Sequence, residues 1–100
     1  MNIQAQHESD LIVRSFAHVA KQLARSGQYP GILTEAEKHQ SALRLVQRDV
    51  FEMAEQRWRG RTLTKEQFHR MREAATQILA QGLREVARIA AQYVPHKLAA

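Results

Sequence analysis

The sequence predicts an all-α fold: a three-helix antiparallel bundle in which the second and third helices form a long hairpin. Apolar residues recur at helical spacing in three segments, helix start and stop signals separate those segments, and the chain contains only four Gly and two Pro. With 100 residues, it is expected to form one domain, 1–100, around a single core.

The first helix is predicted over about residues 10–26. Residues 1–8 are polar without periodicity and are expected to fray, and Ser9 is a plausible N-cap before Asp10. Gly27 stands where a C′ residue would end the helix. One helical face carries the apolar residues Ile12, Phe16, Val19, Ala20 and Leu23.

The opposite face of this first helix is basic. Phosphate contact or attachment to a membrane surface would suit such a face, but a solvated surface is favoured for this helix taken alone. The residues of this face are Arg14, His18, Lys21 and Arg25.

The second helix is predicted over about residues 35–59. Pro30-Gly31 indicates a turn, and Thr34 with Glu37 matches a capping box. Gly60 is the expected C′ residue. The apolar arc is wide enough to need more than one neighbour, and it contains Ala42, Leu43, Val46, Val50, Phe51, Met53, Ala54 and Trp58.

The third helix is predicted over about residues 65–94, with Thr64 and Gln67 as a second capping box and 95–100 as a tail that Pro95 begins. Gly82 either lets another helix approach closely or breaks the segment. Because the apolar phase continues unshifted across Gly82, an unbroken or gently bent helix is favoured. The shorter first helix would leave part of the hairpin uncovered, so a homodimer is favoured over a monomer.

Residues 57–72, called the basic hinge below, connect the second and third helices. They hold six of the fifteen Lys and Arg residues and one of the ten acids, so their net charge of +5 equals that of the whole chain. This clustering predicts a binding surface for phosphate or carboxylate groups. The candidate binding residues are Arg57, Arg59, Arg61, Lys65, Arg70 and Arg72, with Arg14, Lys21 and Arg25 of the first helix.

Two aromatic residues accompany the basic hinge. Trp58 could stack a nucleic-acid base, but Trp58 and Phe68 both fall on apolar arcs, so packing beneath the turn is favoured. A helix-turn-helix motif fits poorly, because its helices are short and these two are long.

The residues show no constellation typical of an enzyme, and no cofactor or small-molecule substrate is expected. The chain has no Cys, and its five His lack spacing that places two ligands on one helical face, so no metal site is predicted. No apolar run approaches the ~20 residues that span a bilayer, and a cytoplasmic location is expected.

The sequence therefore predicts a small non-enzymatic basic protein that binds nucleic acid without sequence specificity, chiefly through phosphates, as a regulatory or accessory factor. The alternative is a protein-interaction module, such as an adaptor, inhibitor or accessory subunit, that docks on an acidic or helical partner surface.

Overall fold

The computed structural model describes residues 3–95, and this part of the chain forms three α-helices and no strand. The helices are α1 (Ile3–Arg25), α2 (Tyr29–Arg59) and α3 (Lys65–Tyr93), and each contacts the other two. The predicted all-α class with three helices is confirmed.

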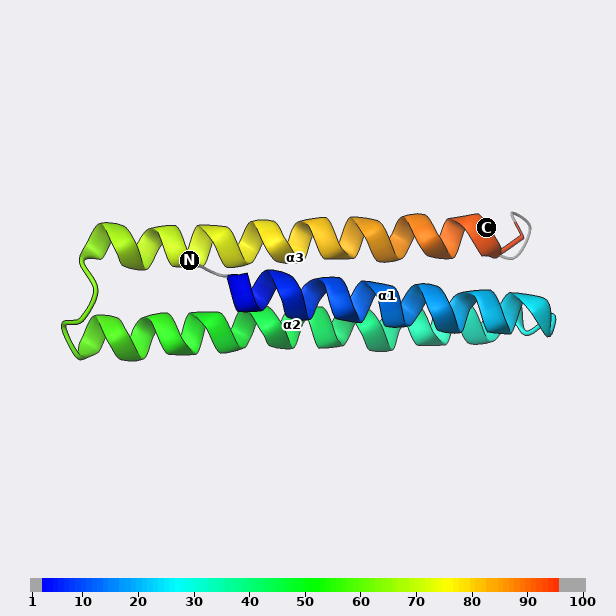
Figure 1. Ribbon diagram of the computed structural model, residues 1–100, viewed down its shortest axis with the longest axis horizontal. Helices are drawn as coiled ribbons and strands as arrows, with labels where there is room; N and C mark the ends of the chain where they lie inside the picture. Colours follow the sequence, from blue (N-terminus) through cyan, green and yellow to red (C-terminus); the bar gives the residue numbers. More distant parts are fainter. Residues whose placement is uncertain (1–2, 96–100) are drawn as a thin grey trace.

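The molecule is a rod (Figure 1). Its principal extents are 53 × 21 × 16 Å, and its radius of gyration of 16.3 Å exceeds the ~13 Å of a compact chain of this length. α1 and α3 run in one direction and α2 runs in the other, and α1 begins well short of the turn between α2 and α3 (Figure 1). One end of the rod therefore has three helices and the other has two.

The main core lies where all three helices meet. Its largest fully buried side chains are Phe16 from α1, Ile32 and Leu43 from α2, and Val86 from α3. Burying a side chain of this size contributes about 1.5–3 kcal/mol relative to leaving it exposed. These four residues hold the three-helix end together.

α1 begins seven residues earlier than predicted, so the expectation that residues 1–8 fray is wrong for residues 3–8; residues 1 and 2 lie outside the described part. Ala5 is buried in a second cluster with Val46, Val50 and Ala75. Ser9 is only 2% exposed and is not an N-cap. Burial of Ala5 and Ser9 against the other helices extends α1 toward the N-terminus. The sequence did not indicate this, because small residues contribute little to an apolar pattern.

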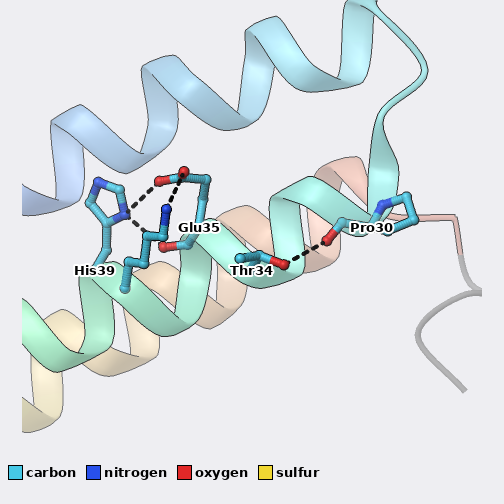
Figure 2. A network of polar contacts seen from close by, with 5 residues as sticks. Pro30, Thr34, Glu35 and His39 are labelled. Carbon is cyan, nitrogen blue, oxygen red and sulfur yellow. Dashed lines mark hydrogen bonds and ion pairs between the residues drawn. The ribbon is translucent and has the colours of Figure 1, made fainter.

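α2 also begins earlier than predicted, at Tyr29, with Pro30 in its first turn, where the fixed φ of proline is compatible with a helix. The predicted Thr34 capping box is wrong. The Thr34 hydroxyl instead donates to the carbonyl oxygen of Pro30 at 3.4 Å from inside the helix (Figure 2). The earlier start places Ile32, which has no exposed surface, in the main core.

The two turns end their preceding helices in different ways. Gly27 has φ +71°, and the N–H of Gln28 donates to the carbonyl of Leu23 at 2.9 Å, so the predicted C′ role of Gly27 is confirmed. In the second turn, Arg61 takes the left-handed position with φ +60°, whereas Gly60 has φ −76°. The predicted C′ role of Gly60 is therefore wrong by one residue.

The start of α3 confirms the second capping box. The Thr64 hydroxyl accepts from the Gln67 backbone N–H at 3.1 Å, and the Gln67 side chain accepts from the Thr64 N–H at 2.9 Å. α3 passes through Gly82 without a break, as predicted, and ends at Tyr93, one residue earlier than expected. The predicted tail beyond Pro95 lies outside the described residues.

Candidate binding site at the basic hinge

The basic hinge forms the two-helix end of the rod. It consists of the last turn of α2, the connecting turn and the first two turns of α3, and it lies beyond the start of α1 (Figure 1). All six of its basic side chains are exposed. The fold thus brings Arg57, Arg59, Arg61, Lys65, Arg70 and Arg72 to one end of the molecule.

Two of these cations have acidic partners. Arg59 pairs with Glu55 at 2.7 Å, and Arg70 pairs with Glu66 at 3.0 Å. Both pairs are exposed, and such pairs contribute about 0–1 kcal/mol, so either arginine can exchange its partner for a phosphate at little cost.

The other basic side chains lack carboxylate partners. Within residues 3–95, Arg57, Arg61 and Lys65 form no ion pair, and Arg72 contacts aromatic rings. Residues 55–72 hold six cations against Glu55 and Glu66, a net charge of +4. The hinge therefore keeps most of its positive charge after local pairing.

The side chain of Arg72 joins the rings of both helices. Its guanidinium lies 4.7 Å from the centroid of Phe51 and 5.5 Å from that of Phe68. Phe68 in turn stacks on Trp58, with centroids 5.5 Å apart and planes 26° apart. We call these four residues, Phe51, Arg72, Phe68 and Trp58, the aromatic column.

Trp58 is not packed beneath the turn as the sequence favoured. It remains 39% exposed, while Phe68 is half-buried between Trp58 and Arg72. The reason is that α1 does not reach this level of the hairpin, so no third helix covers the rings (Figure 1). Trp58 lies on the apolar arc of α2 as predicted, but the prediction that its side chain is buried is wrong.

The basic residues of α1 form a separate surface. Arg14, Lys21 and Arg25 are exposed, and they follow α1 away from the hinge toward the three-helix end (Figure 1). Arg14 lines a groove between α1 and α3 that Asp10 and Glu85 also line. The structure therefore does not join these three residues to the hinge, and the positive charge of Arg14 lies beside acidic groups.

Glu85 in that groove is paired within its own helix. The Arg88 guanidinium donates to the Glu85 carboxylate at 2.8 Å, and this hydrogen bond lowers the pKa of Glu85 below its ordinary value. The same contact raises the pKa of Arg88. The pair is a surface ion pair and presents no unusual acid or base.

His39 and His69, which follow the two predicted caps, are not equivalent in the structure. His39 is half-buried at the three-helix end, where its ring lies 5.3 Å from that of Phe16 and its Nδ1–H donates to the carbonyl of Glu35 at 2.7 Å (Figure 2). His69 is exposed in the basic hinge. The two rings therefore lie on different parts of the molecule.

Among residues 3–95, no three His, Asp or Glu side chains gather in a way that could hold a metal ion. In the same part of the chain, no helix is both long and apolar enough to cross a bilayer. What the hinge offers is a set of exposed guanidinium and ammonium groups beside aromatic faces, which can bind anions and stack planar groups.

Comparison of the chain with protein-family models, curated proteins and solved structures gave no match. The residues of the hinge themselves therefore indicate the function.

One member of the site was missed from the sequence. Phe51 was predicted only to widen the apolar arc of α2, but it is the ring that holds the Arg72 guanidinium. A residue of α2 and one of α3 meet here through the register of the hairpin, and no spacing within one helix reveals that register. The pairing of Arg59 with Glu55, in contrast, follows the ordinary i,i+4 rule.

Proposed function

We propose that this chain is a small non-enzymatic protein that binds nucleic acid through the basic hinge, chiefly by phosphate contacts, as a regulatory or accessory factor. The observation that supports this most strongly is the set of exposed cations without carboxylate partners, Arg57, Arg61 and Lys65, around a turn at the end of the rod. A surface of this charge attracts a polyanion and releases its condensed counterions.

The shape of the hinge favours contact with the nucleic-acid backbone over reading of sequence. A recognition helix enters the major groove with side chains along its exposed face, whereas the hinge presents a turn between two long helices. Arginine suits phosphate because its planar guanidinium forms two parallel hydrogen bonds. We therefore expect binding without sequence specificity.

Fluorescence anisotropy with labelled DNA and RNA across a salt series tests the proposal. Affinity is expected to fall steeply with salt, with a slope of about −0.9 per neutralised phosphate on duplex DNA. The variant Arg57→Gln/Arg61→Gln is expected to bind more weakly and to show a flatter slope.

The matched control removes the same charge elsewhere. Arg44 and Arg84 are also exposed and form no ion pair within residues 3–95, but they lie outside the hinge. Arg44→Gln/Arg84→Gln should change affinity much less than the hinge variant. Equal losses would show attraction by net charge alone, and no binding at low salt would overturn the proposal in favour of an acidic protein partner.

We also infer that two copies of the chain complete the antiparallel bundle, because the hairpin arm beyond Val50 and Ala75 lacks a third helix. Met53, which is 36% exposed, lies in the same sector of α2 as Val46 and Val50 at about 100° per residue. Phe51 and Trp58 of the aromatic column lie in the neighbouring sector of α2. A second copy can therefore cover this face without covering Trp58.

Sedimentation equilibrium tests the dimer. Met53→Glu is expected to weaken association, whereas Leu45→Glu, at an exposed position of α2 outside that sector, should leave it unchanged. A monomer at all concentrations would contradict the inference.

A further inference from the structure

The aromatic column ends in an exposed ring. Its order along the arm is Phe51, the Arg72 guanidinium, Phe68 and Trp58, with successive centres 4.7, 5.5 and 5.5 Å apart. The Phe68 ring contacts both Arg72 and Trp58, and the ring of His69 lies 5.6 Å from it. Trp58 contacts no other ring or guanidinium than Phe68 within residues 3–95, so the column stops at its indole.

The exposure of Trp58 places this end of the column at the surface. The side chain is 39% exposed although its arc position is apolar, and Phe68 supports it at an interplanar angle of 26°. A supported aromatic face loses little side-chain entropy when another planar group stacks on it. Stacking of a base on such a ring contributes about 1–3 kcal/mol and depends little on which base it is.

The cations of the hinge lie next to this ring in the chain. Arg57 and Arg59 flank Trp58 directly, and Arg61 follows in the connecting turn. Arg61 holds the left-handed position that a helix C′ residue usually leaves to glycine. The Arg61 guanidinium forms no ion pair within residues 3–95, so it can contact a phosphate beside the ring.

A shallow hollow continues along the same arm beside the column. It has a volume of about 320 Å³, and Phe51, His69, Arg72 and Thr76 contribute to its lining together with Glu73 and Gln77. A flexible strand that stacks one base at Trp58 can therefore extend past Arg72 without meeting α1.

This inference rests on the proposed function: we propose that the exposed indole of Trp58 stacks an unpaired base, so that the hinge binds single-stranded nucleic acid in preference to duplex. Unpaired bases offer a free face, whereas bases in a duplex are already stacked on both sides. Opening a duplex step costs a few kcal/mol, which phosphate contacts alone do not return. The preference for single strands over duplex therefore depends on the Trp58 ring. The salt-dependent part of the affinity depends on the basic side chains of the hinge.

The experiment compares oligothymidine, oligouridine and a DNA duplex of equal length at equal salt. Trp58 is the only tryptophan in the chain, so intrinsic fluorescence reports on this site directly. We expect tighter binding of the single strands and quenching of Trp58 by them but not by the duplex. The two single-strand arms distinguish DNA from RNA as the source of the unpaired base.

Trp58→Leu keeps an apolar contact for Phe68 but removes the aromatic ring. It should weaken single-strand binding by roughly five- to 150-fold, the equivalent of about 1–3 kcal/mol. Duplex binding should change little. The control Tyr29→Leu removes an aromatic ring at the three-helix end, outside the hinge, and should leave the single-strand preference intact. Quenching in the unaltered protein tests the site even where a variant does not fold.

Two results would overturn the inference. Salt-dependent binding of both single strand and duplex with unchanged Trp58 fluorescence would contradict base stacking and leave the proposed function standing. Absence of binding to every oligomer at low salt would contradict the proposed function and the inference together.

Discussion

Gly82 of α3 lies directly against Leu43 of α2: a methyl group added at Gly82 would be 3.0 Å from Leu43 Cδ2 and 3.0 Å from Ser9 Oγ of α1. All three helices therefore meet at one residue without a side chain. Leu43 is 1% exposed and Ser9 2% exposed, so a methyl group at this position would force buried side chains to shift. Glycine allows this close approach without any shift of the neighbouring side chains.

Gly82→Ala should destabilise the fold even though alanine favours helix formation by about 1 kcal/mol. Overpacking of a tight core costs about 1–3 kcal/mol, so a net loss of up to about 2 kcal/mol is expected. Urea unfolding measures this change in the free energy of unfolding. Leu43→Val makes room for the added methyl group. In that background, Gly82→Ala should cost less stability or become stabilising. Equal effects in both backgrounds would contradict the close contact.

Arg61→Gly should stabilise the fold, because Arg61 occupies the left-handed region with φ +60°. Relief of that strain is expected to give about 0.5–1 kcal/mol, a rise of a few degrees in Tm. Nucleic-acid affinity should fall at the same time, since a guanidinium is lost from the hinge. Thermal unfolding and fluorescence anisotropy measure the two effects.

Gly27→Ala is the reciprocal control for that prediction. Gly27 has φ +71°, and an added methyl would meet nothing within 4 Å, so only the backbone conformation is tested. A loss of about 1 kcal/mol is expected. Loss of stability in Arg61→Gly, or no loss in Gly27→Ala, would show that backbone strain does not govern these turns.

Thr64→Ala should cost about 1 kcal/mol, because it removes the hydroxyl that accepts from the Gln67 N–H at the start of α3. Thr34→Ala is a matched control of the same chemistry within a helix, where the hydroxyl only donates to the Pro30 carbonyl. It should be nearly neutral. Equal losses in chemical denaturation would mean that α2 begins at Thr34, contrary to the structure.

The pKa of Glu85 should rise toward its ordinary value in Arg88→Gln, because the Arg88 side-chain hydrogen bond that lowers it is lost. With a folded pKa below the unfolded one, Glu85 contributes stability above the unfolded pKa, and this contribution disappears as pH falls through the folded pKa. Carboxyl chemical shifts in an NMR titration measure the change. Arg84→Gln is the control and should leave the titration of Glu85 unaltered.

Local signals in the sequence predict the helical class, the number of helices and several of their ends. Thr64 with Gln67, and Gly27, act through bonds within a few residues, so their roles can be predicted from local spacing. The unbroken course of α3 through Gly82 was also predictable, because the apolar phase does not shift there. The charge of the basic hinge is likewise a property of composition alone.

Contacts between distant segments set where α1 and α2 begin and which side chains meet. Ala5 and Ser9 become helical because they are buried against the hairpin, and their small side chains give no strong local signal. The exposure of Trp58 follows from the point at which α1 stops, and its stack on Phe68 follows from the register of α2 on α3. Register and coverage depend on contacts between distant segments, so local periodicity could place these rings on an arc but could not determine what covers them.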